Sequence, residues 1–350
     1  AQVLRDTQFA HDLVFDAVRQ SVPAAIARHS HARVAEWLEA HDGEPARVAQ
    51  HWIDAGQAAR ALPWLHRAAD AAKRALRAKE YVGFMARKSA IEEATGDRAA
   101  AFDSLLAATE ESVLVDRDGA VLDAYCERLE RLASTPAQRV EALLQRGHAL
   151  LQRGQTDQAL GFNQAALRDC LPTGDAALTA RVRRHLGAAY TSAGREAEAL
   201  TQLQACVGWF DANVGADGRG ELHGEMARLY DNLGRLDEAL VHHHLCMDLF
   251  RGSGAISTLA VAYGNLACNR VDAGDLSAAD LALRQSQQIE LAHDEFNGSA
   301  GSTQFMRALT LCHLGRYSEA LDHAERSVES MQRKQPGFVG RARLRPPERL

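Results

Sequence analysis

The 350-residue sequence is poor in the residues that build β-sheets and membrane spans. Aromatic residues make up 6% of the chain, there are eight prolines, and no run of alternating β-branched residues occurs. Because such runs are the main signal for strands, we expect an all-α fold. No apolar run reaches membrane-spanning length and no signal peptide opens the chain, so we expect a cytoplasmic protein without membrane contact.

Paired cysteines and an excess of positive charge are also missing. The six cysteines are scattered without a CxxC pair, at Cys126, Cys170, Cys206, Cys246, Cys268 and Cys312. Several fall at positions of helix packing, and we interpret them as small buried side chains in a reducing compartment. The formal net charge of −6 argues against a nucleic-acid-binding surface over the whole chain.

Motifs for catalysis and for phosphate binding are absent from the sequence. There is no G-x-x-x-x-G-K-[ST] run, so this chain alone cannot cradle a triphosphate. Because G-x-S-x-G and H-E-x-x-H are missing too, we expect no enzyme and no cofactor of its own. His242-His243-His244 and Cys246, with His223 on the partner helix, suggest a metal site. Consecutive helix positions point about 100° apart, so we favour a structural role and expect no metal.

What the sequence does contain is a repeat. Five glycines lie 40, 40, 40 and 41 residues apart, at Gly154, Gly194, Gly234, Gly274 and Gly315. Seven residues before each, the side chain is tiny: Gly147, Gly187, Ala227, Ala267 and Ala308. Five residues after each there is alanine, and twelve after, the residue is again small, as in Cys206 and Cys246. Such a period predicts a solenoid rather than a globular enzyme core.

The repeating unit is predicted to be a helical hairpin. Over residues 182–207, apolar and small residues recur at steps of three and four, which indicates helix. Gly194 interrupts the pattern, and glycine accepts the left-handed conformation that ends a helix. Gly187 and Ala199 would let the two helices of a hairpin approach closely, and Cys206 would let the next hairpin stack on them.

This pattern resembles the tetratricopeptide repeat (TPR). The matching residues of one copy are Leu186-Gly187, Tyr190, Gly194, Ala199-Leu200 and Cys206, and the match covers roughly residues 140–332. The fourth copy departs from it, with Arg270 in place of an aromatic or leucine and Asp280 in place of the leucine. The resemblance implies a TPR-like right-handed superhelix, an α-solenoid of antiparallel helix hairpins.

The N-terminal quarter carries further motifs. Phe9 to Leu13 would open an amphipathic helix and Pro23 the next one, and Gly56 with Ala61 repeats the glycine-plus-five spacing of a hairpin over 46–72. The stretches at 81–84 and 120–132 are expected to be second helices of two degenerate hairpins. We divide the chain into a helical segment (1–45), degenerate hairpins (46–140), five repeats (141–332) and a basic tail or start of a further helix (333–350).

A second resemblance rests on five short elements in this quarter. They are Phe9-Ala10-His11-Asp12-Leu13, Arg28-His29-Ser30-His31, Ala49-Gln50-His51-Trp52, Ala55-Gly56 and Ala68-Ala69. They resemble the segment that follows the nucleotide-binding module of bacterial STAND-type ATPase regulators, a group that includes SARP-like, LuxR-like and maltose-regulon-activator-like transcriptional activators. Ser30 departs from the leucine that is common there. The first residue, alanine, falls in mid-pattern, so we expect an excised piece of a longer protein.

That resemblance implies roles that the residues alone do not establish. An upstream ATPase module would bind ATP or ADP and would be a partner of this chain, and His11 and Asp12 would sense the nucleotide in the full-length protein. The alternative for His11 is a capping or buried role at the start of a helix. We expect no direct DNA contact from this fragment.

The resemblance to TPRs also predicts a ligand-binding groove lined by the first helices of the hairpins. Positions ten, six and three residues before each glycine would point inward: Leu144, His148, Leu151, Arg184, Ala188, Thr191, Gly224, Arg228, Asp231, Gly264, Cys268, Val271, Phe305, Leu309 and Cys312. Arg181, Arg184 and Arg228 would suit an acidic ligand through bidentate contacts. The alternative is that they are solvated and paired with Glu221 or Asp231.

Three functions are compatible with these observations. The first is the TPR sensor of a multidomain ATP-dependent transcriptional regulator, which receives a protein, a peptide or a small-molecule inducer. The second is a TPR scaffold that only holds proteins together. The third is the sensor arm of a nucleotide-cyclase-type signalling protein. The Phe9–Leu13 and His51-Trp52 elements favour the first, because a simple adaptor does not need them.

Overall fold

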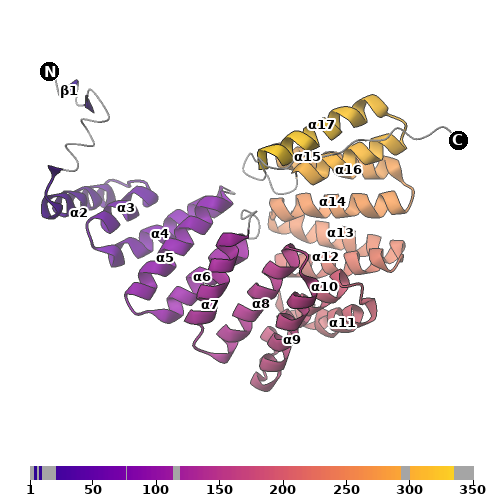
Figure 1. Ribbon diagram of the computed structural model, residues 1–350, viewed down its shortest axis with the longest axis horizontal. Coiled ribbons are helices and arrows are strands. Elements are labelled where there is room, and N and C mark those ends of the chain that lie inside the picture. The colour runs from indigo at the N-terminus through magenta and orange to yellow at the C-terminus, as the bar shows by residue number, and fades with distance from the viewer. Residues whose placement is uncertain are drawn as a thin grey trace. The chain divides into compact units, whose positions relative to one another are not determined.

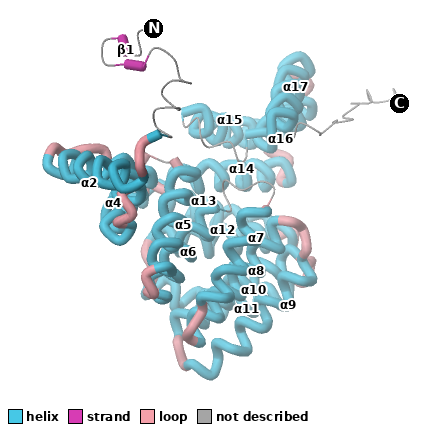
Figure 2. The backbone as a smooth tube through the Cα atoms, turned by 60° about the vertical axis from the view of Figure 1, so that its left-hand side comes forward, coloured by secondary structure: helices cyan, strands magenta, loops and turns pink. Residues whose placement is uncertain are grey.

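The computed structural model describes residues 4–5, 8–9, 21–75, 77–112, 119–292 and 300–334. Within these ranges the chain forms sixteen α-helices, one short 3-10 helix and one two-stranded ladder, as Figures 1 and 2 show. It divides into two compact units, Ala1–Asp116 with Glu127–Ser134 and Arg117–Cys126 with Thr135–Leu350. The helix α7 (Ala120–Leu132) is shared between them, with its first residues in the second unit.

The first unit is a series of antiparallel helices. They are α2 (Ala24–Ala40), α3 (Pro45–Asp54), α4 (Ala58–Arg74), α5 (Ala78–Ala94) and α6 (Arg98–Ser112). Pro23 precedes α2 directly and Pro45 is the first residue of α3, a position where its missing N–H costs nothing. Trp52 and Leu65 are completely buried between α2, α3 and α4 and form the centre of this core.

The second unit is a regular array of hairpins. Its helices are α8 (Pro136–Gln152), α9 (Thr156–Cys170), α10 (Ala176–Ser192), α11 (Glu196–Asn213), α12 (Ala216–Asn232), α13 (Leu236–Ser253), α14 (Ile256–Asp272), α15 (Leu276–Ala292), α16 (Ala300–His313) and α17 (Tyr317–Lys334). The 3-10 helix η1 (Leu171–Thr173) follows α9. Even-numbered helices are the first helices of their hairpins and odd-numbered helices the second.

The repeat glycines form the turns between the two helices of each hairpin. All five have a positive φ, between 66° and 77°, which a side chain would disfavour. The predicted left-handed turns are therefore confirmed. The same conformation occurs at Gly56 between α3 and α4 and at Gly96 between α5 and α6.

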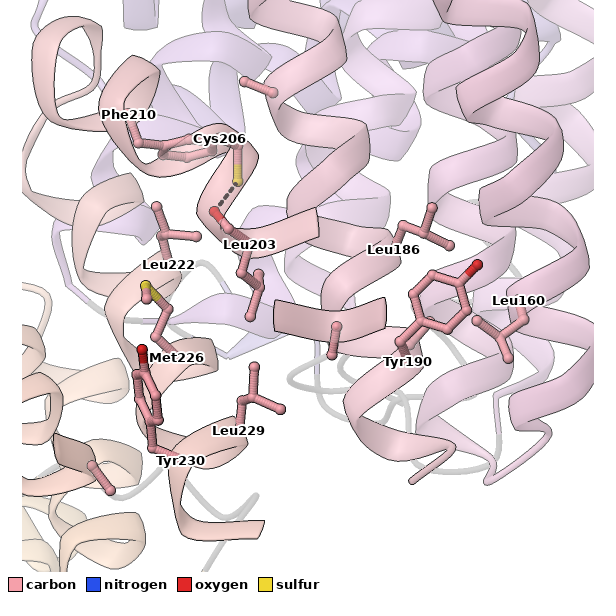
Figure 3. Close-up of a cluster of buried hydrophobic side chains, with 14 residues drawn as sticks. Leu160, Leu186, Tyr190, Leu203, Cys206, Phe210, Leu222, Met226, Leu229 and Tyr230 are labelled. Atoms are coloured by element: carbon pink, nitrogen blue, oxygen red, sulfur yellow. Dashed lines mark hydrogen bonds between the residues drawn. The ribbon is translucent and has the colours of Figure 1, made fainter. Parts of the chain in front are cut away.

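Small residues bring the helices of a hairpin together, as predicted. A Cβ added to Gly187 on α10 would lie 2.6 Å from Leu203 of α11, so the glycine makes this packing possible. Cys206 is fully buried in the same cluster, which runs from α9 to α13 and is shown in Figure 3. Its thiol donates to the carbonyl oxygen of Leu203 at 3.1 Å, the dashed line in that figure.

Three predicted elements differ from the structure. Phe9 does not open a helix but belongs to the two-residue strand β2 (Gln8–Phe9), which pairs antiparallel with β1 (Leu4–Arg5). This ladder is the only strand structure among the described residues. Residues 81–84 lie in α5, which is a first helix, because α5 packs with α6 around Gly96. In the basic tail, Arg333 and Lys334 end α17, and residues 335–350 are outside the described part.

Candidate functional site

The first helices of the second unit share one surface. Helices α8, α10, α12 and α14 pack against each other in chain order. Because the period is 40 or 41 residues, equivalent positions on them lie side by side. We call the surface formed by positions 13, 10, 6 and 3 before each turn glycine, on α8 to α16, the first-helix face.

Ion pairs between neighbouring repeats cross this face. Arg181 on α10 donates two hydrogen bonds to the carboxylate of Glu141 on α8, at 2.6 and 2.9 Å. On its other side α10 is joined to α12 by Arg184, which lies 2.9 Å from Glu221. Each pair spans one repeat, and the bidentate geometry of the first is among the strongest that an arginine makes.

A third arginine and an aspartate continue the series. Arg228 on α12 donates to Glu225 of its own helix, to the Ser192 hydroxyl at 3.1 Å and to the Ala188 carbonyl at 3.4 Å, both on α10. Asp231 accepts from Asn269 on α14 at 2.7 Å and lies 2.8 Å from Nε2 of His243. Polar contacts of this kind therefore connect α8, α10, α12 and α14 in succession.

Two imidazoles lie beneath the charged part of the face. The rings of His148 on α8 and His185 on α10 are 6.0 Å apart, edge to face. Burial lowers the pKa of His148, and Arg184 lowers it further. Burial and Arg184 also hold the pKa of His185 well below its usual value. Both rings are therefore neutral at pH 7 and can exchange hydrogen bonds without adding positive charge.

The character of the face changes at α14. Here the exposed positions are apolar, since Val261 is 42% exposed on α14, and Phe305 and Leu309 are 51% and 39% exposed on α16. Gly264 lies among them, and an added Cβ there would meet no atom within 4 Å. The first-helix face is thus charged over α8 to α12 and apolar over α14 and α16.

The predicted groove residues differ in how accessible they are to a ligand. Arg181, Arg184, Arg228, Asp231 and His148 all lie on the first-helix face, with the partners given above. Thr191 does not offer itself to a ligand, because it is 2% exposed and its hydroxyl donates to the Gly187 carbonyl of its own helix. The repeat pattern could not show this, because the hydroxyl of a helical threonine can donate to a carbonyl oxygen in the preceding turn of its own helix.

The arginines are not three free positive charges. Glu221 pairs with Arg184, in agreement with one of the predicted alternatives. Asp231 does not pair with an arginine of this set but contacts His243 and Asn269. Glu141 and Glu225 were missed by sequence reasoning. One signal was available: Glu141 lies 40 residues before Arg181, at the equivalent repeat position. His11 and Asp12 fall outside the described residues.

The histidine and cysteine cluster at α12 and α13 has no metal-site geometry. In the part of the chain that the structure describes, no group of three or more His, Cys, Asp or Glu residues is arranged to hold a metal ion. Instead, Nδ1 of His223 lies 3.1 Å from Nδ1 of His242. Burial raises the pKa of Cys206 to about 11 and that of Cys246 to about 12, so both remain protonated packing residues.

Comparison with known proteins identifies the fold. No protein-family profile matches the chain. Rap protein complexed with competence and sporulation factor is similar over 77% of this chain and 76% of its own, with a TM-score of 0.60 and 14% identity. The subunit of the APC/C hetero-tetramer Cut9–Hcn1 has a TM-score of 0.55 and 15% identity over 88% of this chain and 57% of its own.

Two further similarities are weaker. The apo quorum sensor NprR of B. thuringiensis has a TM-score of 0.50 and 14% identity, over 79% of this chain and 76% of its own. A yeast protein, the VAB2 subunit of biogenesis of lysosome-related organelles complex 1 from Eremothecium gossypii, is 28% identical over 179 residues, 43% of this chain. The matched part spans about half (52%) of that protein's length.

These similarities establish the architecture and not the activity. The chain is an all-α protein with a TPR-like solenoid fold built from antiparallel helix hairpins. Among the described helices, none is long and apolar enough to cross a membrane. At this level of identity the neighbours show the fold alone, so the function has to be argued from the surface of this chain.

Proposed function

We propose that the chain is a regulatory module that binds a protein or peptide along the first-helix face of its second unit. One observation carries the proposal: this face is continuous across repeats and presents both ion-paired arginines and exposed apolar side chains. A peptide in extended conformation offers both kinds of group at a spacing of a few ångströms. A small-molecule inducer would use only one part of the face.

The names of the structural neighbours support a binding role. One was solved in complex with competence and sporulation factor, one is a quorum sensor and one belongs to a hetero-tetramer. Such repeat folds present extended surfaces that suit recognition. The ion pairs on the face indicate which charges a partner should carry, because each arginine already has a carboxylate partner. An acidic ligand must displace Glu221 or Glu225, so a partner with both charges is favoured over a purely acidic one.

We further propose that the chain works in the cytoplasm as the sensor of a longer ATP-dependent transcriptional regulator. The support is the set of N-terminal motifs, of which Trp52 lies at the packed centre of the first unit. The test is the nucleotide dependence of the full-length protein. With no phosphate-binding loop, this chain alone should not hydrolyse ATP, and a preceding domain should contain the loop. Micromolar ADP binding by the isolated chain would contradict the proposal.

The binding role is tested with a peptide array and three proteins. The array carries acidic, basic, apolar and mixed peptides. The proteins are the wild type, a face variant (Arg184→Ala, Arg228→Ala and Phe305→Ser) and a control variant on second helices (Arg251→Ala and Leu281→Ser). We expect mixed-charge apolar peptides to bind wild type and control, and to lose binding to the face variant.

The size and salt dependence of the effect provide a second check. A hydrogen bond to a charged group contributes about 1.5–3 kcal/mol, and the gain here is smaller because a glutamate is displaced. Calorimetry should show binding that weakens with salt, because the face is open to water. Circular dichroism establishes that each variant is folded. Equal binding by the wild type and the face variant would place the partner elsewhere.

A further inference from the structure

Two histidines in the second unit share a hydrogen bond across a hairpin. His223 on α12 and His242 on α13 face each other with their Nδ1 atoms 3.1 Å apart and their rings stacked, the centroids 5.2 Å apart. A neutral imidazole has one N–H and one lone pair, so one Nδ1–H donates to the other Nδ1. When both rings are protonated, both Nδ1 atoms carry a proton and the bond cannot exist.

The pair is enclosed on one side. His223 is 6% exposed, and its Nε2 lies 3.8 Å from a carboxylate oxygen of Asp211 on α11. Arg219, one turn earlier on α12, opposes a positive charge on this ring. Asp211 therefore favours protonation of His223, while Arg219 and burial act against it.

The other ring has its own neighbours. His242 stacks on Tyr230 of α12 at 5.3 Å between centroids, and Arg235 lies 4.8 Å from that tyrosine ring. On α13 itself, His243 disfavours a charge on His242 and Glu238 favours it. His243 is held by Asp231, which also accepts from Asn269 of α14. The groups around the pair thus come from α11, α12, α13 and α14.

We propose that the His223–His242 pair is a proton-sensitive latch that holds α12 against α13 at neutral pH and releases at mildly acidic pH. Burial lowers the pKa of both histidines, and His223 lowers that of His242 further. The loss of the shared hydrogen bond and the repulsion of two imidazolium rings act in the same direction.

The sign of the pH effect follows from the direction of these shifts. A histidine in the unfolded chain titrates near 6.5, and the folded latch resists protonation. Below about pH 6.5 the unfolded state therefore binds more protons than the folded state, and stability falls. The fall continues until the pH drops below the lowered pKa values of the folded protein. Well above pH 6.5 both rings are neutral in the folded and in the unfolded chain, so the pair adds no pH dependence to stability there.

The latch has a consequence for the binding surface. Helix α12 carries Glu221, Arg228 and Asp231 of the first-helix face, so release of α12 would rearrange the middle of that face. Acid-dependent loss of a bound partner rests on the proposed function, whereas acid-dependent loosening of the hairpin does not. The experiment therefore measures the hairpin itself.

The test is hydrogen–deuterium exchange of the full chain at pH 7.5 and 5.5, corrected for the intrinsic exchange rate. The hairpin α14–α15 contains no histidine and is the internal reference. We expect protection of α12–α13 to fall severalfold more than that of α14–α15, because both imidazoles resist protonation in the closed hairpin and take up protons when it opens. An equal loss in both hairpins would overturn the proposal.

Two variants and the chelator EDTA test whether protonation of this histidine pair causes the acid effect. His242→Gln keeps a hydrogen-bonding side chain that does not titrate, and should remove most of the acid effect. His244→Gln, an exposed residue two positions on, should leave it unchanged. If His242→Gln does not fold, a proton NMR titration of the wild type decides: the assigned imidazole signals of His223 and His242 should both titrate below 6.5. An acid effect that persists in His242→Gln, or that disappears with EDTA, would refute a proton latch.

Discussion

The two units carry different kinds of side chain at the same position of the repeat. Four residues before the turn glycine, the second unit has Tyr190 and Tyr230, each with an arginine guanidinium 4.7 or 4.8 Å from its ring. The first unit has Trp52 in one hairpin and Glu92 in the next. Arg60 covers Trp52 at 3.4 Å, while Glu92 is buried and pairs with Lys88 at 2.6 Å.

The difference extends to how helices are joined. In the first unit Glu39 accepts hydrogen bonds from the indoles of Trp52 and Trp64, at 2.6 and 2.8 Å, and so ties α2 to α3 and α4. In the second unit the joints recur with the repeat, as Arg181 with Glu141 and Arg228 with Ala188 do, each 40 residues apart. In the first unit, a single polar residue that bonds to several helices stabilises the irregular hairpins. In the second unit, the same kind of contact recurs from one repeat to the next.

Each unit also contains a pair of facing imidazoles. In the first unit Nδ1 of His31 lies 2.9 Å from Nδ1 of His51, and Asp54 is 3.9 Å from His31. That pair is more exposed than the His223–His242 latch, since His31 is 36% exposed and Asp54 38%. Burial and His31 lower the pKa of His51 as well, but Asp54 acts against this shift and the pair is open to water. Acid should therefore affect the second unit more than the first.

The largest effect is expected from Trp52→Ala in the first unit. Trp52 is fully buried and donates to Glu39, so its truncation leaves a cavity and removes one of the two indole donors to that carboxylate. A cost of about 3–5 kcal/mol is usual for such a change. Hydrogen exchange should show lost protection in α2, α3 and α4, while α10 to α13 remain protected.

The matched control for this substitution is Trp37→Ala. Trp37 lies on α2 and is 59% exposed, stacked only on His41. Its removal should change stability by about 0.5 kcal/mol or less, as surface substitutions do. If urea unfolding shows the same loss for both variants, Trp52 is not the centre of the first unit.

The second-largest effect tests close packing in the second unit. In Gly187→Ala the new Cβ would meet Leu203 at 2.6 Å, and Leu203 is fully buried. Overpacking of this kind costs about 1–3 kcal/mol, which exceeds the gain of about 1 kcal/mol in helix propensity. A double-mutant cycle with Leu203→Ala measures the coupling by urea unfolding. Without coupling, the two residues would not be in contact as the structure has them.

This comparison also shows which features the sequence could predict. The 40-residue period located the glycine within each hairpin of the second unit, because the left-handed turn there favours glycine. It did not reveal Gly174 and Gly254, which are left-handed between hairpins. Gly96 was missed although Ala101 follows it by five residues, as in the other repeats. Glu92 hides the match, since the same position holds leucine, tyrosine or tryptophan in most of the other hairpins.

The candidate site was predicted only in part, for a related reason. Helical periodicity places Arg181, Arg184 and Arg228 on one surface, but the choice of ion-pair partners depends on how adjacent helices are offset. An offset of one turn decides whether Arg184 meets Glu221 or Glu225, and no local pattern encodes it. The His223–His242 contact depends on side-chain rotamers as well, so the sequence showed the residues and not their bond.

Apart from the Trp37→Ala control, the smallest effect, and the one of opposite sign, is expected from Gly264→Ala. Like Gly187, Gly264 lies in the middle of a first helix, but an added Cβ there meets open space. Glycine in a helix interior costs roughly 0.5–1 kcal/mol relative to alanine, so this variant should be more stable by about that amount in urea unfolding. A loss of stability would mean that α14 is not regular there.

Gly264→Ala also tests whether a partner binds the apolar part of the first-helix face. Gly187 has a packing partner that explains it, whereas a Cβ added to Gly264 meets none within 4 Å among the residues that the structure describes. If Gly264 is retained because a partner approaches the backbone of α14 between Val261 and Phe305, then Gly264→Ala should gain stability and lose peptide binding together. A protein that gains stability and binds the array as the wild type does would restrict the contact surface to the charged part of the face, over α8 to α12. Phe305→Ser alone would then leave binding unchanged, which separates the two halves of the surface.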